Sequence, residues 1–394
     1  MTTLKVFLKP KKEQSLQRFH PWIFSGAIAK FEGKPEEGDV VDVYTASNEF
    51  IAKGHYQIGS IAVRVLSFKD EAIDDNFWLN RISVAYNLRK SIGLAENPEN
   101  NTFRLIHGEG DFLPGLIVDV YDQTAVLQAH SVGMHFMRHI LAECIVKATD
   151  GVVKNVYYKS ETTLPFKAEL DPTDGFILGG DKDNVAIENG LKFHVDWLKG
   201  QKTGFFVDQR DNRALLEKYA KGKSVLNMFC YTGGFSFYAM RGDAKLVHSV
   251  DSSAKAIDLT NENIRLNFGD DARHEAFAED AFKYLDRMGN QYDLVVLDPP
   301  AFAKHRNALR NALQGYRKIN AKAFEKIKPG GILFTFSCSQ VVSKDDFRTM
   351  VFSAAAISKR KVRILHQLTQ PADHPVSVYH PEGEYLKGLV LYVE

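Results

Sequence analysis

The sequence predicts an α/β protein whose carboxyl-terminal part is a doubly wound, mostly parallel sheet. From about residue 200 onward, short continuous apolar runs alternate with segments of helical spacing. Buried parallel strands look like this because helices cover both faces of the sheet. The predicted strands are Val225–Phe229, Leu246–Val250, Leu294–Leu297 and Ile332–Phe336, and the predicted helices are Ala254–Asn267, Asn307–Lys326 and Lys344–Ser358.

Length and composition limit the classes of protein to consider. The chain has 394 residues, 44% of them hydrophobic, and a formal net charge of +1. At roughly 100–200 residues per domain, two or three domains are expected. A disordered tail, a collagen or a small disulfide scaffold is excluded. The near-neutral charge argues against coating nucleic acid by bulk charge alone, although a local basic stripe can lie within a neutral sum.

Cysteine usage and the absence of targeting signals predict a cytoplasmic protein with reduced thiols. The three cysteines, Cys144, Cys230 and Cys338, have no CxxC spacing, which predicts neither disulfides nor a metal site. The amino terminus lacks the apolar region of a signal peptide, and no apolar run approaches the ~20 residues of a spanning helix. We expect no membrane association. The sequence does not reveal the oligomeric state, and a homodimer stays open.

The amino-terminal segment is predicted to be all-β and to bind RNA. Val40–Tyr44, Phe50–Tyr56 and Ile61–Phe68 are rich in β-branched and aromatic residues. Residues 1–30 carry six basic residues and one acid, a local net charge of +5, interleaved with aromatic residues. Bases stack on aromatic rings and phosphates attract lysines, although composition alone favours a solvated basic edge around a core tryptophan. The candidate RNA contacts are Lys9, Lys11, Lys12 and Trp22.

A β/α middle unit is predicted at roughly residues 71–190. Helical spacing marks Asn76–Leu94 and Met134–Lys147. Strand-like runs occur at Phe103–His107, Leu116–Val120, Ala125–Ala129 and Asn155–Lys159.

The loop after the strand at Val225–Phe229 is the first candidate ligand site. Gly233 and Gly234 let the backbone turn tightly and approach a ligand. The next strand ends in Asp251, whose carboxylate can accept hydrogen bonds from ribose hydroxyls. This pairing fits S-adenosylmethionine or NAD, or only a structural turn. Phe237 replaces the third glycine of GxGxxG, which argues against dinucleotide binding.

Three further strand ends carry polar groups. A strand-like run from His274 ends in Asp280, which could contact an adenine amine or serve as the N-cap of a helix at Ala281–Arg287. Asp298 ends the strand Leu294–Leu297 and precedes Pro299 and Pro300, which remove two backbone donors and expose carbonyls to a planar substrate. Phe302 could stack on that substrate. Residues 301–328 then carry eight basic residues and one acid, a net charge of +7 that suits a phosphate backbone.

The last motif is Ser337-Cys338-Ser339, at the end of the predicted strand Ile332–Phe336. A thiol in this position can act as a nucleophile if its thiolate is favoured by a nearby cation or by the helix that starts near Ser343. Cys230 is the rival nucleophile because it also ends a strand. It sits within the glycine loop, however, where it would face a bound cofactor.

The order of these motifs resembles class I S-adenosylmethionine-dependent methyltransferases. More narrowly, the chain resembles the 23S ribosomal RNA 5-methylcytosine methyltransferases with an amino-terminal PUA domain. The stretches that carry the resemblance are Lys202–Arg213, Tyr231–Phe235, Leu297–Phe302, Ser337–Ser339 and the tail Ala372–Pro375 with Pro381–Lys387.

The resemblance implies a domain plan and a set of roles. Residues 1–70 would form the PUA β-barrel, 71–190 a small α/β middle domain, and 191–394 the Rossmann-like methyltransferase domain. Cys338 would be the nucleophile, with Asp298 as its catalytic partner at the base edge. The cofactor S-adenosylmethionine would be bound by Phe206, Asp208, Arg210, Tyr231, Thr232, Gly233, Gly234, Phe235, Asp251, Asp280 and Asp298. Large-subunit ribosomal RNA would contact Pro299, Pro300, Phe302, Lys304 and Arg306 in addition to the amino-terminal basic residues.

Cytosine C5 methylation requires a nucleophile because the ring is electron-poor. A thiolate that adds to C6 makes C5 nucleophilic, and a base must later remove the C5 proton. Many RNA 5-methylcytosine enzymes carry a second cysteine after the proline of this motif, whereas here the position holds Ala301. Three alternatives stay open: methylation of another position or an exocyclic amine without a cysteine nucleophile, a nicotinamide-dependent oxidoreductase, and a catalytically silent RNA-binding module.

Overall fold

The computed structural model describes residues 4–165, 170, 173–180, 183–303 and 305–394. The chain divides into two compact units, each built from discontinuous segments. The first unit comprises residues 1–190, 195–207 and 372–383, and the second comprises residues 191–194, 208–371 and 384–394. We call residues 372–383, which interrupt the second unit, the strap.

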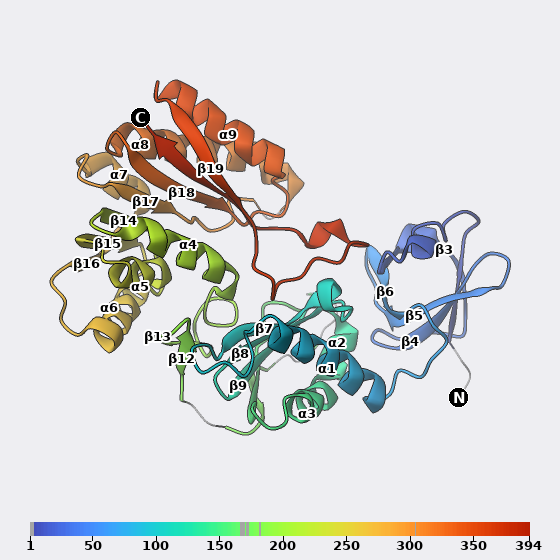
Figure 1. The fold of residues 1–394 in the computed structure, drawn as a ribbon. Coiled ribbons are helices and arrows are strands. Elements are labelled where there is room, and N and C mark those ends of the chain that lie inside the picture. The colour runs from blue at the N-terminus through green and yellow to red at the C-terminus, as the bar shows by residue number, and fades with distance from the viewer. Residues whose placement is uncertain (1–3, 166–169, 171–172, 181–182, 304) are drawn as a thin grey trace. The chain divides into compact units, whose positions relative to one another are not determined.

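The first unit begins with a curled sheet (Figure 1). Among the described residues it has six strands in the order β2-β6-β5-β4-β1-β3. Irregular register between Phe7 and Leu8 and between Lys53 and Gly54 bends the strands. Val6, Val41 and Val63 are fully buried in its core. The strands are β1 (Lys5–Leu8), β2 (Trp22–Phe24), β3 (Ile28–Glu32), β4 (Val40–Tyr44), β5 (Phe50–Tyr56) and β6 (Ile61–Ser67).

A second sheet of the first unit runs in the order β11-β10-β9-β8-β7 and packs against helices. The predicted helix Met134–Lys147 is instead two helices, α2 (Val132–Phe136) and α3 (Arg138–Ala148), because α2 contacts β9 whereas α3 packs mainly on α1. Asp74 caps α1 by accepting the Phe77 N–H at 3.0 Å. The remaining elements are α1 (Asp75–Ser91), β7 (Thr102–His107), β8 (Leu116–Tyr121), β9 (Thr124–Ala129), β10 (Asn155–Tyr158), β11 (Gly175–Leu178) and β12 (Val185–Glu188).

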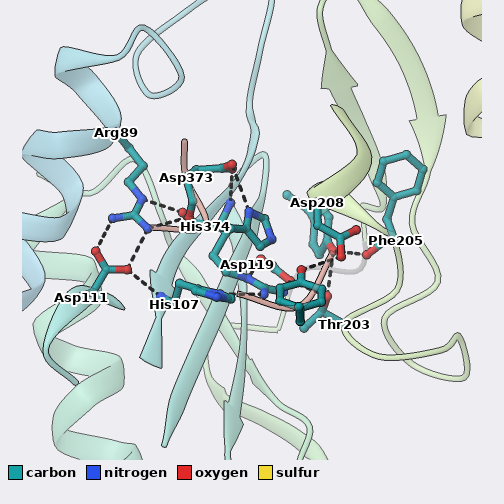
Figure 2. Close-up of polar contacts among 12 residues, drawn as sticks. Arg89, His107, Asp111, Asp119, Thr203, Phe205, Asp208, Asp373 and His374 are labelled. Atoms are coloured by element: carbon teal, nitrogen blue, oxygen red, sulfur yellow. Dashed lines mark hydrogen bonds and ion pairs between the residues drawn. The ribbon is translucent and has the colours of Figure 1, made fainter. Parts of the chain in front are cut away.

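The strap is fixed within the first unit by buried charges (Figure 2). The Arg89 guanidinium donates to both carboxylate oxygens of Asp111, at 2.5 and 2.8 Å, and to the carbonyl of Asp373 at 2.7 Å. The Asp373 carboxylate in turn accepts the backbone N–H of Arg104 at 2.9 Å. Arg89 and Asp373 are both fully buried. The strap motif that the sequence singled out therefore contributes to the packing of the first unit.

The second unit is the predicted doubly wound sheet. Its strand order among the described residues is β16-β15-β14-β17-β18-β20-β19. Strands β14 to β18 pair in parallel, and β20 pairs antiparallel with both of its neighbours. Figure 1 shows α4, α5 and α6 on one face and α7, α8 and α9 on the other. The strands of this sheet are β14 (Ser224–Met228), β15 (Leu246–Asp251), β16 (His274–Ala278), β17 (Leu294–Leu297), β18 (Gly331–Ser337), β19 (Val362–Leu368) and β20 (Lys387–Val393). The second unit also contains β13 (Leu191–His194), which lies outside this sheet.

The helices of the second unit are α4 (Arg210–Ala220), α5 (Gly234–Arg241), α6 (Ala254–Phe268), α7 (Ala281–Arg287), α8 (Leu309–Lys326) and α9 (Lys344–Ile357). The last four match predicted helices to within two residues at each end, whereas α4 was not predicted. A capping box of Ser343 and Asp346 starts α9. None of the described helices combines the length and the apolarity that crossing a membrane requires.

Candidate active site

The second unit places the predicted site residues at one edge of its sheet. The glycine loop follows β14, Asp251 ends β15, Asp298 follows β17 and Cys338 follows β18. These strands are parallel neighbours, so their carboxyl ends share one rim. From β14 the chain first adds strands on one side of the sheet and then, with β17, on the other side. Open α/β sheets bind ligands at such a reversal of the strand order.

The loop after β14 has a strained backbone. Phe229, Tyr231 and Gly233 adopt positive φ angles of 58°, 49° and 86°. A non-glycine residue in this region costs roughly 1–3 kcal/mol and tends to occur at functional sites. A Cβ on Gly233 would lie 2.7 Å from Cγ2 of Thr260 and 2.8 Å from Cε1 of Phe237. The loop therefore requires glycine at position 233 for both its conformation and its packing.

The Asp251 carboxylate is fixed by two backbone hydrogen bonds. Its two carboxylate oxygens accept the backbone N–H of Tyr231 at 3.0 Å and that of Ser253 at 2.9 Å. Each oxygen keeps a second lone pair, which suits the two hydroxyls of a ribose. Nearby, the Thr232 hydroxyl is buried and has no hydrogen-bond partner among the described residues. An unsatisfied buried hydroxyl beside an oriented carboxylate fits a polar ligand such as S-adenosylmethionine.

Asp280 has the structural role that the sequence left open. Its carboxylate accepts the Lys283 N–H at 3.0 Å and so caps α7, while the side chain is exposed. Contact with an adenine amine stays a prediction for this residue.

Replacing Gly233 by alanine should weaken the binding of S-adenosylhomocysteine and destabilise the second unit. The left-handed backbone and the two close contacts together should cost about 1–3 kcal/mol, equivalent to roughly a tenfold or greater loss of affinity if the loop shifts. Calorimetric titration measures the affinity. Gly269→Ala is the matched control, because Gly269 also has a positive φ of 66° but a Cβ there would meet nothing within 4 Å. Equal affinity losses in the two variants would contradict the prediction.

Asp298 has the environment of an acid–base group. The carboxylate accepts an amide hydrogen of Gln209 at 3.1 Å. Loss of hydration, reinforced by the nearby Asp208 carboxylate, raises the pKa of Asp298 to about 7. The group can therefore exist in either protonation state near neutral pH, which is the property a proton donor or acceptor needs.

Two residues beside Asp298 were missed by sequence reasoning. Gln209 is held by Asn212, whose amide donates to Oε1 of Gln209 at 2.6 Å. Tyr385 donates its hydroxyl to Asp208 at 2.6 Å. Both lie within stretches that carried the family resemblance, but neither residue type alone indicates a role. The predicted cofactor residue Arg210 is buried at the start of α4.

The three cysteines differ sharply in environment. Cys144 and Cys230 are buried, whereas Cys338 is partly exposed. Burial raises the pKa of the Cys230 thiol far above its ordinary value, and the Asp251 carboxylate raises it further. A thiol that resists ionisation is a poor nucleophile. The structure therefore favours Cys338 over its rival.

The residues around Cys338 are fixed by packing. The Ser339 hydroxyl lies 2.9 Å from the Tyr316 hydroxyl and accepts the Ala303 N–H at 3.4 Å. Phe302, predicted to stack on a substrate, packs on Tyr316 with ring centroids 4.6 Å apart and is only partly exposed. This packing joins the end of β18 to the segment after Pro300.

The basic segment 301–328 is partly paired. Lys322 forms an ion pair with Asp286, and Lys328 lies 3.1 Å from Asp293. Arg306 and Arg310 are exposed. Lys304 lies outside the described residues.

The predicted RNA contacts of the amino-terminal sheet belong to the first unit. Lys11 and Lys12 are exposed, and Lys9 donates to the carbonyl of Gly26 at 2.9 Å. Trp22 is partly buried, with its indole N–H donating to Glu109 at 2.8 Å. Phe206 also belongs to the first unit, and its contact with a cofactor stays a prediction.

Family models match most of the chain. A model described as S-adenosylmethionine-dependent methyltransferase matches residues 175–381, and a model described as PUA-like domain matches residues 6–68. Among solved structures, a provisionally assigned S-adenosylmethionine-dependent methyltransferase from Streptococcus mutans has a TM-score of 0.83 at 21% identity, covering 99% of this chain and 100% of that one. A second provisionally assigned methyltransferase, complexed with S-adenosylhomocysteine, has a TM-score of 0.84 at 22% identity and covers 100% of both chains. Similarity at these identities shows the fold alone.

Curated relatives are closer in sequence. A protein of Alteromonas mediterranea named ribosomal RNA large subunit methyltransferase I is 41% identical over 99% of this chain and 98% of its own length. A protein of the same name from Erwinia tasmaniensis is 38% identical over 99% of this chain and 100% of its own length. The chain therefore belongs to the S-adenosylmethionine-dependent methyltransferases, in the family of the proteins named ribosomal RNA large subunit methyltransferase I.

Proposed function

We propose that this enzyme methylates C5 of a cytosine in large-subunit ribosomal RNA, with Cys338 as the nucleophile. The names of the full-length relatives support the RNA class, and the PUA-like sheet with its exposed lysines supports RNA binding. The observation that carries the proposal is the partly exposed thiol of Cys338 at the end of β18. That strand neighbours β17, which Asp298 directly follows.

The chemistry assigns a distinct task to each group. The Cys338 thiolate adds to C6 of cytosine, which breaks the aromaticity of the ring and makes C5 nucleophilic. Bound S-adenosylmethionine supplies the electrophilic methyl group. The C5 proton then leaves to a base, the C6–S bond breaks, and the thiolate and the C5–C6 double bond are restored.

Asp298 would hold a proton at the Watson–Crick edge of the base. Addition of a thiolate to C6 places negative charge on the ring, and a protonated carboxyl at N3 neutralises it. The raised pKa of Asp298, about 7, keeps a fraction of the carboxyl protonated near neutrality. If the target cytosine lies in a duplex, it has to be extruded to reach these groups.

The test is methylation of ribosomal RNA from a strain that lacks this gene. RNA carrying tritium at cytosine C5 should release one tritium for each methyl group gained, and nucleoside analysis should find 5-methylcytidine. Methylation of an exocyclic amine, which the Asp298-Pro299-Pro300 motif also permits, would retain the tritium. Retention with methyl transfer would contradict the C5 assignment, and salt-sensitive RNA binding without transfer would contradict catalysis.

A further inference from the structure

A buried lysine stands beside the candidate nucleophile. Lys387 is the first residue of β20 and pairs directly with Ser337, the last residue of β18. The Lys387 Nζ donates to the carbonyl oxygen of Ser339 at 2.7 Å. The ammonium group is therefore held at the strand end that carries Cys338.

The buried ammonium group of Lys387 would be stabilised by a nearby anion. The residue is 5% exposed, and the Glu384 carboxylate near it is already paired with Lys344. Burying an ammonium without a counter-ion is unfavourable, so such groups normally pair with an anion or lose their proton. Burial lowers the pKa of Lys387 to about 8, while the charges of Cys338 and Glu384 act in the opposite direction. At neutral pH most of the group is still protonated.

The other charged and titratable groups near Cys338 are poor sources of positive charge. From α9, Lys344 pairs with Glu384 and is more than half exposed. From α8, Tyr316 is a neutral phenol whose pKa is raised by burial. From the end of β17, Asp298 is a carboxyl group. Lys387 is thus the buried cation of this cluster among the described residues.

We propose that Lys387 is a positioning residue that stabilises the thiolate of Cys338. The proposal rests on Cys338 being the nucleophile of the proposed function. On ionisation the thiol proton passes to solvent, and the resulting thiolate and the ammonium form an ion pair. After the C6–S bond breaks, the same ammonium receives the released thiolate. Lys387 forms no bond to the substrate.

The test measures the ionisation of Cys338 without RNA. The rate of alkylation of Cys338 by iodoacetamide, followed by peptide mass spectrometry over a pH series, gives the apparent pKa of its thiol. Lys387→Met should raise this pKa by about one to two pH units, which lowers the thiolate fraction at neutral pH roughly ten- to a hundredfold. Lys387→Arg should restore most of the ionisation. Lys344→Met, which removes the exposed neighbouring cation, should change it little.

Lys387→Gln separates charge from hydrogen bonding. Its amide can still donate a hydrogen bond, but it carries no charge, so it should behave like Lys387→Met. The proposal would be overturned if a folded Lys387→Gln or Lys387→Met variant that binds S-adenosylhomocysteine kept the wild-type pH profile of Cys338 alkylation. It would also be overturned if Lys344→Met raised the pKa of Cys338 as much as these two variants do. Because the assay contains no RNA, its outcome is independent of which base is methylated. Retained tritium in the RNA assay would remove the proposed function and leave the ion pair standing.

Discussion

Replacing Cys338 by alanine should abolish methyl transfer to RNA while leaving the affinity for S-adenosylhomocysteine unchanged. Without a thiolate at C6, cytosine C5 stays electron-poor, and loss of a covalent nucleophile typically lowers the rate by at least about 10⁴-fold. The glycine loop, which is predicted to bind the cofactor, follows β14, whereas Cys338 follows β18, so binding should persist. Methyl transfer from labelled S-adenosylmethionine and calorimetric titration measure the two quantities.

A covalent trap sharpens this prediction. RNA that carries 5-fluorocytidine at the target position cannot lose a proton from C5, so the adduct should accumulate with the wild-type enzyme. It should be absent from Cys338→Ala. Cys230→Ala is the matched control, because Cys230 is buried and its thiol pKa is raised. Formation of the adduct by Cys338→Ala, or its loss in a folded Cys230→Ala variant, would contradict the assignment of the nucleophile.

Replacing Arg89 by methionine should strongly lower the free energy of unfolding of the first unit. The guanidinium is fully buried and makes two hydrogen bonds to Asp111 and one each to the carbonyls of Arg104 and Asp373. Removing one partner of a buried pair leaves the other charge uncompensated, which costs about 3–5 kcal/mol. For a unit of this size, the melting temperature should fall by roughly 10 °C.

Tryptophan fluorescence follows the unfolding of the first unit. The chain has three tryptophans, Trp22, Trp78 and Trp197, and all of them lie in the first unit. Lys147→Met is the control, because Lys147 and Glu143 form an exposed pair at 3.9 Å that is worth at most a few tenths of a kcal/mol. Adding Asp111→Asn to Arg89→Met should recover part of the loss by removing the stranded charge. An Arg89→Met shift no larger than that of Lys147→Met would refute the prediction.

The parallel strands and helices of the second unit were predictable because their pattern is local. Continuous apolar runs place β14, β15, β17 and β18 to within a residue or two at each end. The strand β20 was not predicted, although Gly388–Val393 is an apolar run. Its position between β18 and β19 depends on pairing across about fifty residues, and no local period encodes such a contact.

The sequence predicts those residues of the candidate site that lie at the ends of recognisable strands. Asp251 ends a strand that the sequence locates, and Asp298 and Cys338 follow two others. Lys387, in contrast, reaches the backbone of Ser339, next to Cys338, only through the missed strand. Gln209 and Tyr385 were missed for the same reason, because their contacts with Asp298 and Asp208 join distant segments. The packing of Phe302 on Tyr316 likewise joins segments that no local pattern connects, and its predicted stacking on a substrate stays a prediction.

The interrupted second unit has a consequence for dissecting the enzyme. The chain changes units after residues 190, 194, 207, 371 and 383, so neither unit corresponds to one continuous stretch. A fragment that begins at residue 208 would carry the strap without the partners of Asp373, while a fragment that stops at residue 371 would lack β20 and Lys387. Cleavage within the strap would leave β20 held by non-covalent contacts alone, namely its strand pairing and its buried core side chains. We therefore expect a nicked enzyme to stay assembled in buffer and to come apart in denaturant. Separate study of the methyltransferase sheet would require joining residues 371 and 384 by a short designed linker.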